Sequence, residues 1–545
     1  MRAFFLAAAL LVSLPLAAAE PALVLFVTVD QLRGDTPWRL RDRFGEGGFR
    51  YLMDRGAVYA DAHFRHSMTK TGPGHATLFT GSGPAGHGLV SNDWFDRELG
   101  RDVNCVEDTA SPLLGNLPGE AATDPHAGRS PRRLTASTIG DELVLASGGR
   151  SRVFAASLKD RGAIVPAGRK GKAWWYQKTA GEFVSSRYYF TQLPGWVTAW
   201  NQARPAHGFL GEKWTLMHPR ESYRARDMDD RPFEKMRGTL GRTFPHPLGD
   251  RPGPEFYTAL RYTPMADELL LDFVEEMMRQ EQVGRSGETD LLAVSFSATD
   301  YIGHAFGPFS LEAEDNALRL DRTLARLLQS VDAQVGLERT LVVLTSDHGV
   351  APAPEYMAAN GFSAERHQPE RLVAGVNAAL KAEFGTDRNL VLAFTSPSLY
   401  LDRAALSELS IDPARAERVA AETLEADPGL RLALTRSDLL AGRVPPNEEA
   451  RRLAGSFHRE RSGDVLVAVE PFWYLSSEPD GEAAMHGSLH RYDTHIPLMI
   501  AGPGIAAQVI YRRVHPGDVA PTLSAYLGIA PPSGSSGKLL AEVLP

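Results

Sequence analysis

Long apolar runs recur along the chain, and each is followed within a few residues by an acidic side chain. Residues 22–29 end at Asp30, residues 291–296 lead to Asp300, and residues 340–345 lead to Asp347. Uninterrupted apolar runs are typical of strands that are buried on both faces of a parallel sheet. Open α/β sheets bind ligands at the carboxyl ends of such strands. The pattern predicts an α/β fold with a large, mostly parallel central sheet.

Helix-like segments alternate with these runs. Apolar positions spaced three and four residues apart predict helices over residues 45–56, 264–281 and 310–335. A further helix is predicted over residues 71–80. Alternation of this kind places helices on both faces of the sheet. Periodicity alone gives only this fold class, and a more specific architecture can be expected only from the motifs described below.

Two segments depart from the alternation and predict inserted subdomains. Residues 163–258 are rich in Trp, Tyr, Pro and Arg and contain a predicted hairpin, so we expect a cap over the active site. Residues 353–480 carry short helices and strands and predict an accessory subdomain. The rest of residues 20–545 forms the catalytic domain in this prediction.

The first 19 residues have the pattern of a secretory signal peptide. Arg2 supplies a positive charge, residues 4–16 are apolar, and residues 17–19 are small. The apolar run is shorter than the roughly 20 residues that a spanning helix needs. Cys105 is the only cysteine, which excludes an intramolecular disulfide. We predict a periplasmic or secreted protein with no membrane span, and we expect a monomer.

Composition and charge narrow the possible partners. The chain has 545 residues, of which 43% are hydrophobic, and a net charge of −9. Basic residues do not form runs, so no nucleic-acid partner is expected. An anionic substrate would need a local positive source. Lys159 and Arg161, just past the predicted strand 152–156, either clamp phosphate oxygens or form a solvated edge.

The stretch Met68-Thr69-Lys70-Thr71-Gly72-Pro73-Gly74-His75 places a hydroxyl where a loop meets a predicted helix. Free backbone N–H groups and the helix dipole at such a junction favour an anion. Thr71 could equally be a simple N-cap followed by Pro73. Asn92, in a turn-rich segment after this helix, has an equally ordinary reading as a turn residue.

Metal-ligand side chains cluster after the core strands. Asp300 and His304 are four residues apart, Asp347 and His348 are adjacent, and His486, His490 and His495 follow one another near a further strand. Oxygen and nitrogen ligands without a usable thiol suit two divalent ions of the zinc type. Two such ions about 4 Å apart stabilise both the attacking and the leaving oxygen of an in-line phosphoryl displacement. A hydroxyl beside them becomes a nucleophile near neutral pH.

Taken together and in order, these motifs resemble the alkaline phosphatase superfamily, and within it the secreted, threonine-nucleophile enzymes of the phosphate-irrepressible type. The motifs extend over nearly the whole mature chain, and the resemblance implies an alkaline-phosphatase-like architecture. The matching segments are 27–30, 71–75, 92–95, 157–161, 300–304, 347–349, 486–488 and 518–522. Two departures stand out: Gly72 occupies a position where related enzymes often have Ala, and Lys70 adds a charge beside the nucleophile.

The resemblance implies a role for each matching residue. Thr71 is implied to be the nucleophile of a phosphomonoesterase that works through a phosphothreonine. Two zinc ions are implied. The first would be bound by Asp300, His304 and His486, and the second by Asp30, Thr71, Asp347 and His348. Asn92, Lys159 and Arg161 are implied to hold the non-bridging phosphate oxygens.

Two other functions remain to be weighed. A phosphodiesterase or nucleotide pyrophosphatase could use the same metal core. The Lys159 and Arg161 pair is similar to that of monoester-hydrolysing members, because a monoester dianion benefits from two further cations. A phosphate-binding protein without turnover is the second alternative. The intact Thr71 within a complete ligand set argues against it.

Overall fold

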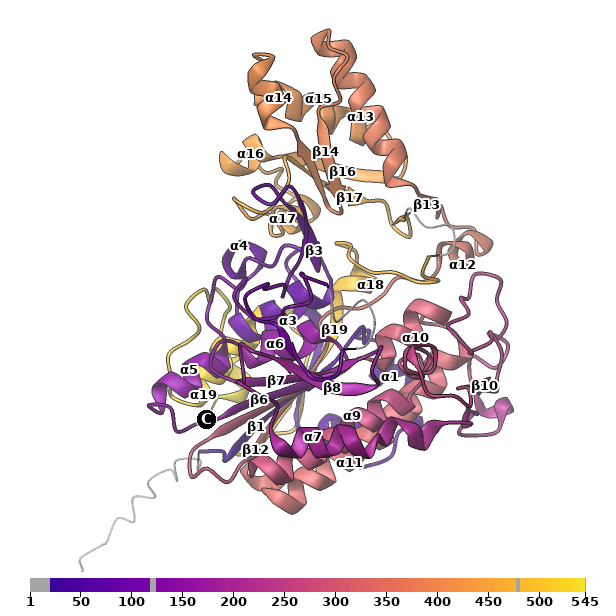
Figure 1. Cartoon of the computed structure of the whole chain (residues 1–545), viewed down its shortest axis with the longest axis vertical. Coiled ribbons are helices and arrows are strands. Elements are labelled where there is room, and N and C mark those ends of the chain that lie inside the picture. The colour runs from indigo at the N-terminus through magenta and orange to yellow at the C-terminus, as the bar shows by residue number, and fades with distance from the viewer. Residues whose placement is uncertain (1–19, 118–123, 477–480, 545) are drawn as a thin grey trace, which may run out of the picture.

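The computed structural model describes residues 20–117, 124–476 and 481–544 (Figure 1). The predicted signal peptide lies outside these residues. Within the described part of the chain, no helix combines the length and the apolar character needed to cross a bilayer.

A ten-stranded sheet forms the centre of the described structure. Its order is β20-β2-β19-β12-β1-β11-β6-β7-β8-β5. Strands β12, β1, β11, β6 and β7 are mutually parallel, and β19 and β8 run antiparallel to their neighbours. The large, mostly parallel sheet is confirmed. The strands are β1 (Leu23–Val29), β2 (Ala57–His63), β5 (Leu113–Leu114), β6 (Val153–Ser157), β7 (Lys172–Gln177), β8 (Glu182–Ser186), β11 (Asp290–Phe296), β12 (Thr340–Thr345), β19 (His495–Ala501) and β20 (Gln508–Ile510).

Strand β1 shows why the central runs are continuously apolar. Its side chains alternate between two hydrophobic cores, with Leu25 and Val27 in one and Val24 and Phe26 in the other. Every residue of β1 is therefore buried. Helices α2 (Phe49–Arg55), α9 (Met265–Glu281) and α11 (Leu311–Gln334) cover the first core, and α3 (Thr71–Thr80), α5 (Ile139–Ala146), α6 (Asp160–Ala167) and α19 (Val519–Tyr526) cover the second.

The segment expected to be a cap differs from the prediction in its first part. Its hairpin, β7 and β8, joins the edge of the central sheet, where Trp175 pairs with Val184. The following residues pack on α11: Trp214 Nε1 and the Tyr223 hydroxyl both donate to the buried Asp315 carboxylate, at 2.6 and 2.5 Å. Coverage of the active site by residues 163–258 stays a prediction.

The second inserted segment forms a compact unit beside the main body, drawn in orange at the top of Figure 1. Four strands in the order β14-β15-β17-β16 pair antiparallel and bury their own hydrophobic core. Helices α13 (Pro369–Phe384) and α15 (Pro413–Glu425) cover it. The strands are β14 (Val391–Thr395), β15 (Ser398–Leu401), β16 (Leu430–Thr435) and β17 (Val465–Val469). Within the predicted segment 353–480, residues 369–469 form this unit, and from here on we call them the accessory subdomain.

A hairpin of the main body contacts this subdomain. Strands β3 (Asp93–Asp96) and β4 (Arg101–Asn104) pair antiparallel, next to the turn-rich segment that contains Asn92. Arg97 donates to the Leu401 carbonyl at 3.0 Å and forms an ion pair with Asp464. Asn92 directly precedes β3. The accessory subdomain therefore contacts the segment that carries this predicted site residue.

Candidate active site

Three neighbouring strands bring the acidic candidates together. Strands β11, β1 and β12 are adjacent and parallel, and their carboxyl ends lead to Asp300, Asp30 and Asp347 respectively. Asp30 and Asp347 are fully buried, and Asp300 is 2% exposed. Asp300 lies in α10 (Ala298–Phe306), which begins directly after β11. The structure thus places the predicted carboxylates at one edge of the sheet.

Thr71 lies at the first position of α3, facing the same edge. Its Oγ1 is 3.5 Å from His348 Nε2 and 3.4 Å from Lys159 Nζ. Close approach depends on Gly74, because a Cβ there would lie 2.1 Å from the Asp347 carbonyl oxygen. Thr69 is differently placed, since its hydroxyl donates to the Ser488 carbonyl at 2.8 Å. Of these two threonines, Thr71 is the one whose hydroxyl faces the cluster.

Asp300, His304 and His486 form the first of two candidate metal-binding groups. The Asp300 Oδ1 atom is 3.2 Å from His304 Nε2 and 3.5 Å from His486 Nε2. Burial opposes ionisation of Asp300, but His304 and Lys159 outweigh it and hold the pKa of this carboxyl well below its usual range. Asp300 is therefore an anion in this arrangement.

The second group consists of Asp30, Asp347 and His348. His348 Nε2 is 3.4 Å from Asp30 Oδ1 and 3.5 Å from Asp347 Oδ2. Burial, followed by the charges of Asp300 and Asp347, raises the pKa of Asp30 well above its usual range. The two groups adjoin, because the His348 and His486 rings stack with centroids 3.6 Å apart. Crowding of buried carboxylates in this way is costly without a compensating cation.

The imidazoles are oriented as metal ligands require. In each of His304, His348 and His486, Nδ1 lies 2.7 to 3.0 Å from a backbone carbonyl oxygen, to which it donates as the Nδ1–H tautomer. Each Nε2 is then the ring atom that faces the carboxylates and that would hold a divalent ion between them. Burial lowers the pKa of His348 to about 3, which keeps this ring neutral. Among the described residues, buried Asp30 Oδ1 accepts no hydrogen bond, Asp30 Oδ2 faces the Lys159 ammonium at 2.7 Å, and Asp347 Oδ2 lies 3.3 Å from His75 Nδ1. The residues fit a pair of divalent ions.

Lys159 is the N-cap residue of α6, which follows β6, and Arg161 lies in the first turn of that helix. Lys159 Nζ lies between the two groups, 2.7 Å from Asp30 Oδ2 and 2.5 Å from Asp300 Oδ2. Burial opposes its charge, but Asp30 and Asp300 outweigh burial and raise the pKa of Lys159. Arg161 Nε is buried and has no acceptor among the described residues. Lys159 contacts the acidic ligands and Thr71, and Arg161 lies near enough for its charge to oppose the upward shift of the Lys159 pKa.

Asn92 is joined to the nucleophile segment. Its Oδ1 accepts the Gly72 backbone N–H at 2.7 Å. The Nδ2 amide group donates to no acceptor among the described residues. The amide is thus a donor held beside Thr71 by a backbone contact.

Two further residues belong to the site but were not singled out from the sequence. Gln31 Nε2 donates to Asp300 Oδ1 at 2.9 Å, and its backbone N–H donates to Asp347 Oδ1 at 3.2 Å. His75 is completely buried, with Nδ1 2.9 Å from the Thr71 carbonyl and Nε2 3.0 Å from Ser295 Oγ. His75 was visible only as part of the nucleophile motif, and Gln31 only as a polar neighbour of Asp30.

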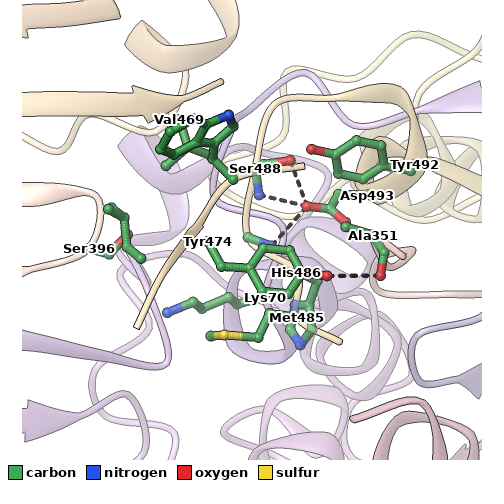
Figure 2. Close-up of a pocket in the computed structure, with 13 residues that line it drawn as sticks. Lys70, Ala351, Ser396, Val469, Tyr474, Met485, His486, Ser488, Tyr492 and Asp493 are labelled. Atoms are coloured by element: carbon green, nitrogen blue, oxygen red, sulfur yellow. Dashed lines mark hydrogen bonds between the residues drawn. The ribbon is translucent and has the colours of Figure 1, made fainter. Parts of the chain in front are cut away.

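A cavity adjoins the nucleophile on the side of the accessory subdomain (Figure 2). Lys70 and His486 line it from the catalytic edge, and Val469 and Ser396 line it from the subdomain. Burial lowers the pKa of Lys70, with Asp93 opposing this shift and Arg161 reinforcing it. The site therefore continues from Thr71 toward the accessory subdomain.

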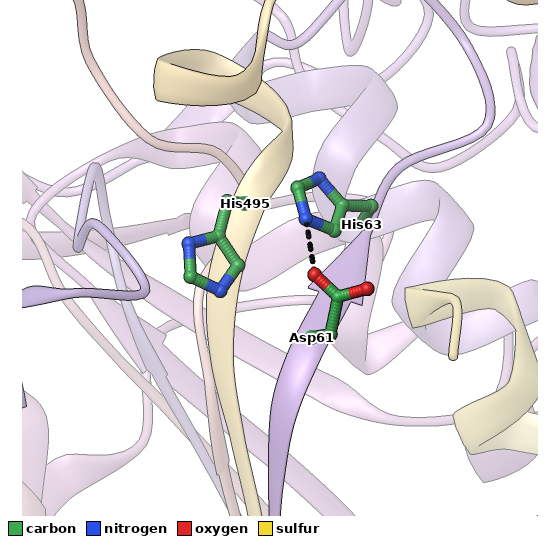
Figure 3. A group of neighbouring side chains, drawn as sticks. All are labelled: Asp61, His63 and His495. Carbon is green, nitrogen blue, oxygen red and sulfur yellow. Dashed lines mark hydrogen bonds and ion pairs between the residues drawn. The ribbon is translucent and has the colours of Figure 1, made fainter. Parts of the chain in front are cut away.

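The remaining histidine candidates serve other contacts. His490 Nε2 is 2.9 Å from the Val469 carbonyl. His495 belongs to a third cluster, with Asp61 and His63, on strands β2 and β19 (Figure 3). Arg513 Nε lies 3.0 Å from Asp61 Oδ2, and His63 Nε2 lies 3.0 Å from Asp61 Oδ1. Since Asp61 already has these partners, we interpret the cluster as side-chain contacts that support the pairing of β2 with β19.

Comparison with known proteins agrees with this geometry. The family model described as type I phosphodiesterase / nucleotide pyrophosphatase matches residues 24–493. Alkaline phosphatase PhoV of Synechococcus elongatus is 34% identical, covering 97% of this chain and 94% of the relative. Alkaline phosphatase PafA of Elizabethkingia meningoseptica is also 34% identical, covering 97% and 95%.

Solved structures give the same result. The crystal structure of wild-type alkaline phosphatase PafA matches with a TM-score of 0.88 and 32% identity, over 97% of this chain and all of that one. Murine ectonucleotide pyrophosphatase / phosphodiesterase 5 matches with a TM-score of 0.52 at 14% identity, which shows the shared fold alone. The chain therefore belongs to the type I phosphodiesterase / nucleotide pyrophosphatase family, within the alkaline phosphatase superfamily, and is an enzyme of the alkaline phosphatase type.

Proposed function

We propose that this enzyme is an exported phosphomonoesterase that transfers the phosphoryl group to Thr71 and then to water at a site for two zinc ions. The observation that carries the proposal is the position of Thr71 Oγ1, within 3.5 Å of both His348 Nε2 and Lys159 Nζ. The hydroxyl thus adjoins the second ligand group directly, and Lys159 links it to Asp300 of the first. Export is proposed from the signal-like residues 1–19.

The residues present account for the chemistry in two displacements. Two divalent ions held by the two groups would supply positive charge to the phosphoryl oxygens and lower the pKa of the Thr71 hydroxyl. Thr71 Oγ then attacks phosphorus, the bond from phosphorus to the leaving oxygen breaks, and the alcohol leaves. Water cleaves the resulting phosphothreonine, which releases inorganic phosphate and restores the hydroxyl. Contacts with backbone carbonyl oxygens orient the three imidazoles of the site, those of His304, His348 and His486.

Three side chains are proposed to bind the transferred phosphoryl group. When cations neutralise Asp30 and Asp300, the Lys159 ammonium becomes available to an oxygen of the substrate. Arg161 offers an unpartnered Nε, and Asn92 offers its amide. A solved variant of PafA carries substitutions at a threonine and an asparagine 21 positions apart and at a lysine and an arginine two positions apart. Thr71, Asn92, Lys159 and Arg161 have the same spacings here.

Phosphodiester or pyrophosphate hydrolysis is the second candidate, favoured by the name of the matching family model. A monoester dianion has three charged non-bridging oxygens, whereas a diester gives up one of these positions to a second substituent. Lys159 and Arg161 therefore favour the monoester. Charge-assisted contacts contribute roughly 1.5–3 kcal/mol each, so the pair accounts for several decades of preference in a site closed to water.

Rates on matched esters test this assignment. Phosphate mono- and diesters with one leaving group should be compared on the zinc-loaded wild type and on the Lys159→Ala, Arg161→Ala double variant. We expect monoester kcat/KM to fall far more than diester kcat/KM, so that their ratio approaches unity or inverts. Equal losses on both esters would mean that the pair supports structure or metal placement, and the monoesterase assignment would lose its main support.

A further inference from the structure

The cavity beside Thr71 joins two different surfaces. One wall comes from the catalytic edge and contains Lys70 and His486. The opposite wall consists mainly of apolar and aromatic side chains from the end of β17 and the segment after it, among them Val469, Trp473 and Tyr474. Since Lys70 directly precedes the nucleophile, a group that occupies this cavity is attached to the phosphoryl group or lies next to it.

The Lys70 side chain is held in an extended path into this cavity. Its backbone is extended at the start of α3, with φ −125° and ψ 162°. Its stem crosses Gly487, where an added Cβ would lie 3.2 Å from Lys70 Cε and 3.5 Å from Cγ. In Figure 2 the ammonium points away from Asp493 and toward the side on which Ser396 lies. The cation is thus directed toward the accessory subdomain.

No carboxylate in the described part of the chain forms an ion pair with this cation, and the Asp93 carboxylate favours its charge without direct contact. Lys70 Nζ has no ion pair or hydrogen bond there, whereas Lys159, on the other side of Thr71, contacts two carboxylates. The acid that lines the same cavity, Asp493, is engaged through one oxygen: its Oδ2 accepts from the Gly487 and Ser488 N–H groups and from the Ser488 hydroxyl. Its Oδ1 is buried without a partner among the described residues and makes no ion pair with Lys70. A half-buried ammonium without a partner is a binding element for an anion.

We propose that this cavity is a leaving-group subsite, in which Lys70 binds a second anionic group of the substrate while the organic body of the leaving group lies against the apolar wall. The proposal rests on the phosphomonoesterase function proposed above. It names the substrate class: monoesters whose leaving group carries its own carboxylate or a second phosphate. The scissile phosphoryl group remains with Asn92, Lys159 and Arg161.

Pairs of aryl phosphates that differ in one anionic group test the subsite. One pair is carboxyphenyl phosphate and carbamoylphenyl phosphate, and the other is phenylene bisphosphate and phenyl phosphate. On the zinc-loaded enzyme we expect kcat/KM to favour the charged member of at least one pair. The Lys70→Met variant should lose that preference by about ten- to hundredfold, the effect of one charge-assisted contact. Lys70→Arg should retain most of it.

Controls separate the possible failures. Lys213→Met removes one exposed positive charge on β9 (Lys213–Trp214) and should leave the preference unchanged. Preference in only the carboxylate pair or only the phosphate pair identifies which anion is bound. Equal losses on charged and uncharged members in Lys70→Met would overturn the subsite, because Lys70 would then act on the scissile group. A wild type that hydrolyses none of these monoesters would instead refute the proposed function.

Discussion

At the scale of single residues, the position of the Asn92 amide beside Thr71 depends on the lack of a side chain at Gly72. A Cβ at Gly72 would lie 2.9 Å from Cys105 Sγ and 3.1 Å from Asn92 Oδ1. The buried thiol therefore occupies the space that a larger residue at position 72 would need. Gly72 and Cys105 are complementary, and their contact determines where Asn92 can lie.

We predict that Gly72→Ala lowers monoester kcat/KM by about tenfold, the value of one hydrogen bond, because the added methyl displaces Asn92. The Gly72→Ala, Cys105→Ala double variant should recover most of this loss, since removal of the sulfur reopens the space. Cys105→Ala alone serves as the control and should have little effect on the rate. Losses that simply add in the double variant would contradict the proposed contact.

The location of a single residue could be predicted from the sequence where its place after a strand determines where it lies in the fold. Asp30 and Asp347 follow buried parallel strands directly, so their common edge could be inferred. Gln31 could not be found in this way. Its backbone has φ 70°, an unusual value for a residue other than glycine, and its contact with Asp300 spans 269 positions. Local sequence contains no signal for such a contact.

At the scale of elements, the helix that carries Asp300 and His304 is anchored by its neighbour. Asp267, in α9, accepts the Ser297 and Ala298 N–H groups at the start of α10, both at 3.1 Å on Oδ1. Its Oδ2 is buried and has no hydrogen-bond donor among the residues that the structure describes. Burial raises the pKa of Asp267 to about 7, and the two N–H contacts oppose this shift. The protonated carboxyl still offers Oδ1 to the helix.

This pKa predicts how stability depends on pH. Between pH 4 and 7 the folded chain retains a proton on Asp267 that the unfolded chain has lost, so stability falls as the pH rises through this window. In Asp267→Asn the acceptor remains but this titration is absent. We predict that the free energy of unfolding of the variant, relative to wild type, rises by about 1–3 kcal/mol between pH 4.5 and 7.5. Denaturant titrations at both values measure it, and an unchanged difference would contradict the raised pKa.

Elements whose partners are distant were harder to predict. The periodicity identified the helix 264–281 and the strand 340–345 closely. It could not show that β7 and β8 extend the central sheet, because an edge strand and a separate hairpin have the same alternation. Nor did it reveal β4, which is short and polar and is stabilised by pairing with β3.

At the scale of the whole molecule, the active site lies between the central sheet and the accessory subdomain. Motifs from segments as distant as Asp30 and His486 meet at the carboxyl edge of three adjacent strands. Their order along the chain allowed the fold and the ligand set to be expected. The apolar wall opposite Lys70 was not expected, because it depends on how the second inserted segment packs against the first half of the chain.

The central claim is that all these segments serve one nucleophile, Thr71. Zinc-loaded enzyme should be quenched in acid during turnover of a phosphate monoester, and its peptides should be examined by mass spectrometry for a phosphoryl group. We predict phosphate on Thr71 and none in Thr71→Ala, which should lose most activity while retaining its fold. Phosphate on Thr69, or undiminished turnover by Thr71→Ala, would contradict the account.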